Sequence, residues 1–218
     1  MAKAEKKEQS EKKQEKKEQK QEQKKSAKGF YHYIKQAWKK PTEEKIVETR
    51  KRMIDWRASN RIVKVEKPLR LDRARSLGYK AKKGIIVYRI TIGRGGRQNI
   101  RPSTKRRSKR FSVKKILRMN YQWVAEQRVQ IAHPNLEVLN SYKLGKDGQY
   151  YFFEVICIDP NMPEIKSDPN LNWICNPKNR NRVLRGLTSA GRKSRGLMNR
   201  SPNLKVRPSL RAWKRRGR

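Results

Sequence analysis

The sequence predicts an α/β fold of the α+β type, in which helices sandwich a small mixed or antiparallel β-sheet. Three observations predict it. Residues 84–92 are dense in β-branched side chains, and two more strand-like runs, 136–144 and 150–158, flank a Gly-Lys-Asp-Gly turn. Apolar residues at helical spacing recur on both sides of the first strand. Long basic extensions and an N-terminal Lys/Glu/Gln arm complete the expected architecture.

Two helices are expected near the N-terminus. Residues 30–40 place their apolar side chains on one helical face, and Pro41 ends the helix. Thr42 is a suitable cap for a second helix, which has apolar residues from Ile46 to Trp56 and ends before Asn60.

Two more helical segments follow. Residues 69–77 suggest a short helix or turn that Gly78 ends in the left-handed conformation. Ser112 is the expected cap of a long helix reaching residue 132, with an apolar stripe along one side.

The expected organisation has three parts. Residues 1–28 contain no aromatic or branched aliphatic side chain and form a charged arm, either disordered or a fraying helix. Residues 29–175 form the α/β domain, with a basic extension at about 93–111. Residues 176–218 form a basic tail expected to take its shape from a partner.

Charge indicates the class of partner. The chain has 59 Lys plus Arg against 19 Asp plus Glu, a formal net charge of +40. A compact domain with this charge repels itself unless a polyanion neutralises it. The 53 positions from residue 73 to 125, and the 50 positions after Asp168, contain no acid at all. An ordinary solvated surface mixes both signs, so these stretches are interpreted as phosphate-binding surfaces.

The first acid-free stretch contains a glycine loop, residues 93–97, directly after the best strand. Its glycines would let backbone N–H groups approach phosphates while its arginines reach outward. The loop has neither the P-loop lysine and hydroxyl pair nor the dinucleotide spacing, which argues against a nucleotide site. Residues 101–110 follow as an extension expected to become ordered on nucleic acid.

The second stretch contains residues 185–197, where cations alternate with small residues and hydroxyls. Small residues permit close backbone packing, and the cations and hydroxyls suit phosphate and ribose oxygens. A flexible basic tail without specific docking is the alternative. Trp213 stands outside any core-forming sequence, so base stacking is a candidate role for it, with a purely structural role left open.

The candidate nucleic-acid-binding residues are the cations of these segments together with that tryptophan. They are Lys80, Lys82, Lys83, Arg94, Arg97, Arg101, Lys105, Arg106, Arg107, Lys109, Arg110, Arg182, Arg185, Arg192, Lys193, Arg195, Arg211, Trp213, Arg215 and Arg216.

Catalytic and metal-binding patterns are not expected. The two histidines, His32 and His133, lie far apart, and Cys157 and Cys175 do not form a CxxC pair. We therefore expect no enzyme activity, no metal, no cofactor and no small-molecule substrate. No run approaches the roughly 18 apolar residues of a membrane span, so a membrane partner is not expected either.

Four strings resemble the archaeal and eukaryotic ribosomal protein family fifteen-e of the large subunit. They are residues 73–84, 138–142, 153–160 and 185–197, and their order and spacing match as well. Short strings at 161–163 and 173–175 look like the archaeal branch. The first 28 residues depart from the family pattern, which leaves the role of the arm open.

The resemblance implies an α/β/α domain whose extensions enter large-subunit ribosomal RNA. It implies one copy per cytoplasmic ribosome, neighbouring ribosomal proteins as further partners, and a structural role without catalysis. Charge alone leaves an architectural DNA-binding protein as the alternative, since both polyanions attract cations. Long extensions that cannot fold alone suit the irregular clefts of folded RNA better than duplex DNA.

Overall fold

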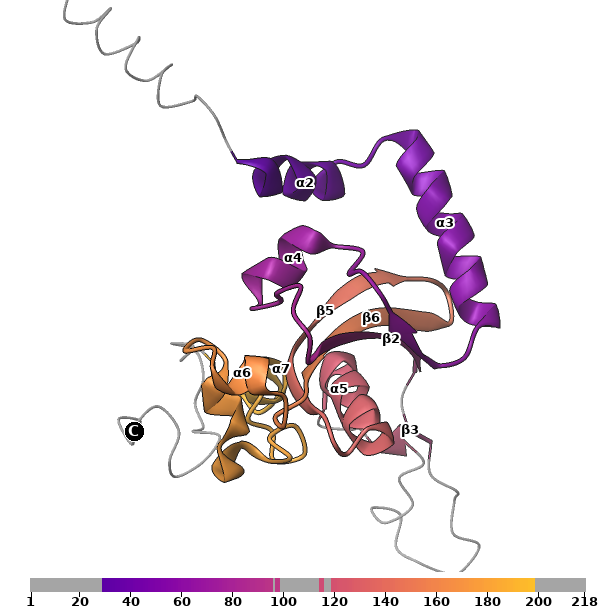
Figure 1. Ribbon diagram of the computed structural model, residues 1–218. Coiled ribbons are helices and arrows are strands. Elements are labelled where there is room, and N and C mark those ends of the chain that lie inside the picture. Colours follow the sequence, from indigo (N-terminus) through magenta and orange to yellow (C-terminus); the bar gives the residue numbers. More distant parts are fainter. Residues whose placement is uncertain (1–28, 96, 99–113, 116–118, 199–218) are drawn as a thin grey trace, which may run out of the picture. The chain divides into compact units, whose positions relative to one another are not determined.

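The computed structural model describes residues 29–95, 97–98, 114–115 and 119–198 (Figure 1). The helix α2 (Phe30–Lys39) belongs to one compact unit, and all later elements belong to a second unit that begins at Glu43. The further helices are α3 (Glu43–Ala58), α4 (Leu71–Ser76), α5 (Tyr121–Ala132), α6 (Pro163–Lys166) and α7 (Ser189–Ser194), with the 3-10 helices η2 (Asn172–Cys175) and η3 (Pro177–Asn179).

The second unit is built on a four-stranded antiparallel sheet. Its strands are β1 (Ile62–Val65), β2 (Ile85–Gly93), β5 (Glu137–Lys146) and β6 (Tyr150–Ile158), in the order β1-β2-β6-β5. A separate two-stranded ladder pairs β3 (Arg97–Gln98) with β4 (Lys114–Lys115). The three expected strands are therefore confirmed as β2, β5 and β6, and β1 is an addition to them.

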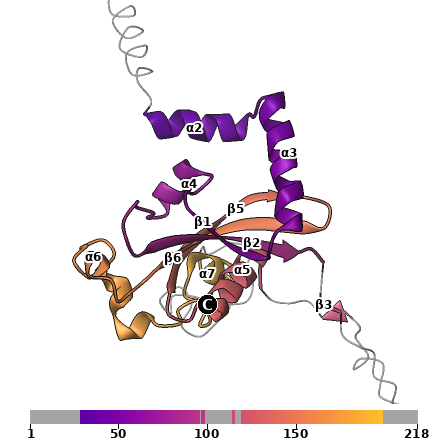
Figure 2. The ribbon, with the colours of Figure 1, turned by 45° about the vertical axis from the view of Figure 1, so that its right-hand side comes forward.

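Alternation along β2 and β6 divides the core between the two faces of the sheet. Ile90 pairs with Phe153, and both belong to a cluster with residues of α5 and α7. Val87 pairs with Ile156, and both belong to a cluster with residues of α4, α6 and η2. Because successive strand side chains point to opposite faces, one sheet supports both clusters. Figures 1 and 2 show α5 and α4 on opposite sides of the sheet, which confirms the expected helix-sheet-helix sandwich.

The expected helix from Ser112 to residue 132 is wrong in its first part. The helix α5 begins at Tyr121, and Lys114–Lys115 form a strand instead. Asn120 is the cap, since its side chain accepts the N–H of Trp123 at 2.7 Å. The side-chain amide of Asn120 also donates to the carbonyl of Ala190, 3.1 Å away. This contact with a segment 70 residues later in the chain could not be found from local spacing.

The expected hairpin turn is also displaced. Gly145 and Lys146 belong to β5, whose register shifts between Lys143 and Gly145. This irregularity adds a residue to one strand and moves the turn toward Asp147. The Asp147 carboxylate then accepts the N–H groups of both Gln149 and Tyr150. Gly78, by contrast, has a φ of +100° after α4, as the sequence predicts.

Candidate RNA-binding surface

The helix α5 fixes the C-terminal basic segment to the sheet. The buried indole N–H of Trp123 donates to the carbonyl of Val183 at 2.8 Å. The backbone N–H of Asn120 donates to the hydroxyl of Ser194 at 3.0 Å. Val183 and Ala190 are 0% and 3% exposed and belong to the same core cluster as Trp123. The division between domain and tail at residue 175 stays a prediction, but the core includes side chains from beyond it.

A buried carboxylate holds the start of α7. Glu126 is fully buried and accepts hydrogen bonds from the hydroxyls of Ser141 and Thr188, the latter at 2.6 Å. Burial raises the pKa of Glu126, and the two hydroxyl donors only partly oppose this rise. Thr188 is also the helix cap, since its hydroxyl accepts the N–H of Gly191. One threonine thus joins the helix cap to the core carboxylate.

Two glycines allow α7 to pack closely against the preceding turn. Gly186 has a φ of +66°, a conformation that favours glycine. A Cβ atom on Gly191 would lie 2.7 Å from the Cα of Gly186, and one on Gly186 would lie 3.0 Å from the Trp123 ring. The close backbone packing predicted for the small residues of this segment is therefore present.

Three of the arginines predicted to bind nucleic acid donate to carbonyls of the protein itself. Arg182 donates to the carbonyls of Val138 and Leu139 at 2.8 and 2.9 Å, and burial lowers its pKa. Arg185 donates to two carbonyls of the preceding turn, at 2.5 and 2.7 Å. Arg195 donates to the carbonyls of residues 185 and 186, at 3.3 and 3.2 Å. These arginines brace the segment from within.

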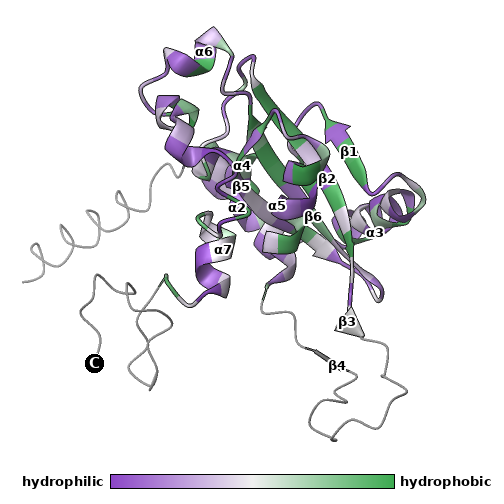
Figure 3. Ribbon diagram, turned by 90° about the horizontal axis from the view of Figure 1, so that it is seen from below, coloured by the Kyte–Doolittle hydropathy of each residue, from purple (hydrophilic) through white to green (hydrophobic). Residues whose placement is uncertain are grey.

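Arg192 and Lys193 differ from the other cations of this cluster. Both lie in the last turn of α7 and are exposed. In the part of the chain that the structure describes, neither side chain makes a hydrogen bond or an ion pair. Figure 3 shows hydrophilic colour along this part of α7. The two cations are therefore available to an external anion, on a helix that the core fixes.

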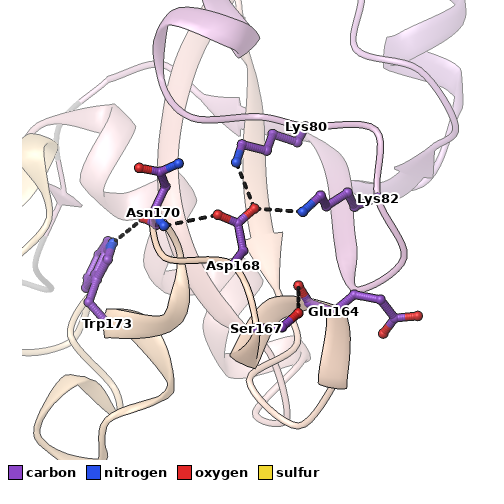
Figure 4. A network of polar contacts seen from close by, with 7 residues as sticks. All are labelled: Lys80, Lys82, Glu164, Ser167, Asp168, Asn170 and Trp173. Carbon is purple, nitrogen blue, oxygen red and sulfur yellow. Dashed lines mark hydrogen bonds and ion pairs between the residues drawn. The ribbon is translucent and has the colours of Figure 1, made fainter.

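Lys80 and Lys82 converge on a single carboxylate (Figure 4). Their ammonium groups lie 2.7 and 2.8 Å from the same Asp168 oxygen, Oδ2, while Oδ1 accepts the N–H of Asn170 at 3.0 Å. The lysine hydrogen bonds hold the pKa of Asp168 well below its usual range. The Asp168 side chain is 3% exposed, but the lysines are 38% and 43% exposed. Lys83 beside them is exposed.

The glycine loop after β2 is also occupied by internal contacts. The Arg94 side chain donates to the carbonyls of Asp147 and Gly148 at 2.6 and 3.2 Å, and its guanidinium lies over the Tyr151 ring. The N–H of Gly95 donates to the Tyr121 hydroxyl at 3.0 Å. The described start of this loop thus joins the β5–β6 turn to α5, and the N–H of Gly95 does not point to an open anion site.

The remaining predicted residues lie partly outside the described ranges. Arg97 is in β3, where only the backbone pairing is described. The others lie outside the described residues: Arg101, Lys105, Arg106, Arg107, Lys109, Arg110, Arg211, Trp213, Arg215 and Arg216.

Two buried acids are important to this surface and were not found from the sequence. Glu126 anchors α7, and Asp168 joins Lys80 to Lys82. Each is an acid at the edge of an acid-free stretch, and that position is the only sequence signal for them. Among the residues described, no group of three or more His, Cys, Asp or Glu could hold a metal ion, and no helix is long and apolar enough to cross a membrane.

The fold and the surface define a strongly basic α+β protein whose cationic segments are attached to one β-sheet. A protein-family model described as Ribosomal L15 matches residues 29–213. The chain therefore belongs to the ribosomal L15e family, and it is a structural protein of the large subunit of the cytoplasmic ribosome. The match begins after the N-terminal arm, so residues 1–28 lie outside it.

Proposed function

We propose that the protein binds and stabilises folded large-subunit ribosomal RNA, with one copy in each ribosome, and that α7 is a docking point for the RNA backbone. The observation that carries the proposal is the pair Arg192 and Lys193. Both are exposed, and within the described residues neither side chain has a partner. Phosphate contacts of Lys and Arg supply much of the affinity of proteins for nucleic acids.

The bracing of α7 supports this role. Ordering a long cationic side chain or a loop on binding costs free energy. The Glu126–Thr188 hydrogen bond and the Trp123–Val183 hydrogen bond already fix the backbone on which the two cations stand. RNA would then need to order only the side chains. Arg182, Arg185 and Arg195, which donate to carbonyls of the protein itself, contribute by stabilising the conformation of the segment that carries α7.

The second part of the proposed interface is the lysine group near Asp168. The ammonium groups of Lys80 and Lys82 are held a short distance apart by one oxygen atom and remain partly exposed. Lys83 adds a third, exposed cation. Three cations on one loop suit adjacent phosphates of a folded strand. The basic residues outside the described ranges are proposed as extensions of the same interface.

Salt-dependent RNA binding tests the proposal. The double variant Arg192→Gln/Lys193→Gln keeps the inward arginines and removes only the exposed charges. Its affinity for a large-subunit rRNA fragment should fall. The plot of log K against log salt concentration should also become less steep, by about 0.7–0.9 in slope for each lost phosphate contact. The matched control Lys64→Gln/Lys67→Gln removes the same charge from exposed positions outside the acid-free stretches.

An unchanged slope in the α7 variant, or an equal decrease in the control, would refute α7 as a docking point. Competition with duplex DNA in the same assay tests whether the protein prefers RNA to DNA. Folded rRNA should displace the protein from DNA at much lower concentration than the reverse, and equal competition would contradict the RNA proposal. The wild-type chain should also remain with the large subunit through a high-salt wash.

A further inference from the structure

Three exposed cations gather around the ring of Tyr151, which lies in β6 between β2 and β5. The guanidinium of Arg94, directly after β2, lies 5.4 Å from the centroid of this ring, and the ammonium of Lys143 in β5 lies 4.7 Å from it. Lys146 is the β5 residue paired with Tyr151, so both side chains stand on the same face of the sheet. We call Arg94, Lys143 and Lys146 the Tyr151 cluster.

The base of the Tyr151 cluster is fixed by the fold. The Tyr121 ring at the start of α5 lies against Tyr151, with 4.7 Å between the ring centroids, and its hydroxyl donates to the carbonyl of Gly95. The Arg94 side chain donates to the carbonyls of the β5–β6 turn. A cation over an aromatic face is attracted by the negative face of the ring. Tyr151 therefore holds two of the cations close to each other.

These like charges are gathered without a carboxylate partner. Burial, and then the charges of Lys146 and Arg94, lower the pKa of Lys143. In the described ranges, no ion pair joins a carboxylate to any of the three cations, and the side chains of Lys143 and Lys146 make no hydrogen bond.

The acids nearest in sequence do not supply the missing charge. The segment that continues from Arg94 contains no Asp or Glu before Glu126, which is buried and bonded to two hydroxyls. The carboxylate of Asp147, next to Lys146, accepts two backbone N–H groups and lies 3.6 Å from the Nε of Arg57. The repulsion within the cluster is therefore relieved best by an anion from another molecule.

We propose that the Tyr151 cluster is a further docking site for the RNA backbone, in which Arg94, Lys143 and Lys146 bind phosphate oxygens. Lys and Arg supply many of the phosphate contacts of nucleic-acid-binding proteins. The inference rests on the proposed function for the identity of the anion. Lys143 and Lys146 lie outside both acid-free stretches, so the charge pattern of the sequence did not single them out. The sheet brings them to Arg94.

Lysine footprinting of the full chain tests the proposal. The protein is treated with an amine-acetylating reagent, alone and bound to complete large-subunit rRNA, and the labelled positions are read by mass spectrometry. Lys143 and Lys146 should be labelled in the free protein and several times more slowly in the complex. Lys64 and Lys67, which are also exposed, are the reference pair. Equal labelling of Lys143 and Lys146 with and without RNA, or equal protection of both pairs, would overturn the site.

The same footprint in assembled large subunits tests for another occupant. Protection of Lys143 and Lys146 in the subunit but not by rRNA alone would show that a protein covers the cluster. That outcome would overturn the assignment to RNA.

Charge variants then test whether the two lysines contact phosphates. With complete rRNA, Lys143→Gln/Lys146→Gln should make the plot of log K against log salt concentration less steep, by about 0.7–0.9 for each lost contact. Lys143→Arg/Lys146→Arg keeps both charges and should leave the slope unchanged. An equal change of slope in both variants would show that the loss of charge is not the cause, and would overturn the proposal.

The results separate this inference from the proposed function. If Arg192→Gln/Lys193→Gln lowers the slope and Lys143→Gln/Lys146→Gln does not, the Tyr151 cluster is overturned and the docking point on α7 stands. The reverse result supports the cluster and counts against α7. If rRNA does not displace the protein from duplex DNA, the RNA proposal itself fails, and the assignment of the anion fails with it.

Discussion

The indole N–H of Trp123 donates to the carbonyl oxygen of Val183 at 2.8 Å, joining two residues that are 60 positions apart in the chain. Both residues are buried in the cluster on the α5 face of the sheet. This hydrogen bond attaches the part of the C-terminal acid-free stretch around Val183 to the folded domain. The cations of α7 therefore stand on a fixed backbone.

Trp123→Phe should lower the free energy of unfolding by about 0.5–1.5 kcal/mol, because it removes one of the two donors to the buried Val183 carbonyl, which keeps only the N–H of Gly186. Denaturant unfolding followed by circular dichroism measures the change. Trp173→Phe is the matched control, because its indole N–H donates to an exposed carbonyl, that of Asn170. If Trp173→Phe lowered the free energy of unfolding as much as Trp123→Phe, the loss could not be assigned to the burial of the Trp123–Val183 hydrogen bond.

Gly191→Ala should destabilise the protein although the residue is in a helix, where alanine is normally better than glycine by about 1 kcal/mol. The new Cβ would lie 2.7 Å from the Cα of Gly186, and a backbone atom cannot move aside cheaply. We expect a loss of about 1–3 kcal/mol in unfolding free energy. Gly148→Ala, where no atom lies within 4 Å of the new Cβ, should change stability little. A stabilised Gly191→Ala protein would contradict the close packing.

Glu126→Gln should change how stability depends on pH. Burial raises the pKa of Glu126 in the folded chain above its unfolded value. Below about pH 4 the carboxyl is protonated in both the folded and the unfolded state, so it does not destabilise the fold. The contribution of Glu126 to the free energy of unfolding then falls as the pH rises through the folded-state pKa. The glutamine variant should gain relative to the wild type over that rise, by about 1.4 kcal/mol per unit of pKa difference.

Unfolding free energies of both proteins between pH 4 and 8 measure this gain. Glu66→Gln, at an exposed position, should show no comparable change with pH. Parallel pH profiles for wild type and Glu126→Gln would contradict the raised pKa.

Asp168→Asn should lower the thermal midpoint at neutral pH, because Lys80 and Lys82 would lose their common partner. The hydrogen bonds from the lysines lower the pKa of Asp168, so its contribution is present above the unfolded value and is lost as pH falls through the folded value. The difference between variant and wild type should therefore shrink below about pH 4. Scanning fluorimetry across pH measures it.

Asp55→Asn removes a carboxylate at an exposed position of α3 and should have little effect at any pH. If the Asp168 variant matched the wild type at pH 7, the lysine contacts would contribute nothing to the fold.

The elements found correctly from the sequence share one property, namely that local pattern and tertiary environment favour the same structure. The β-branched run that forms β2 lies between β1 and β6, where both of its faces are covered. The start of α5 was wrong because two residues, Ser112 and Asn120, could each cap a helix. The contacts of Asn120 with Ala190 and Ser194 favour the second, and those partners are remote in sequence.

The sequence by itself determined the polyanionic class of partner, the three long strands and the family. Each of these depends on a local property of the chain, namely its charge, its β-branched composition and the matching strings. Only the tertiary structure decided which cations are engaged internally. Arg182 meets carbonyls of β5 and Lys80 meets Asp168, whereas Arg192 stays exposed. The physical reason is that a hydrogen bond depends on the position of its acceptor, and folding places these acceptors from 43 to 88 residues away.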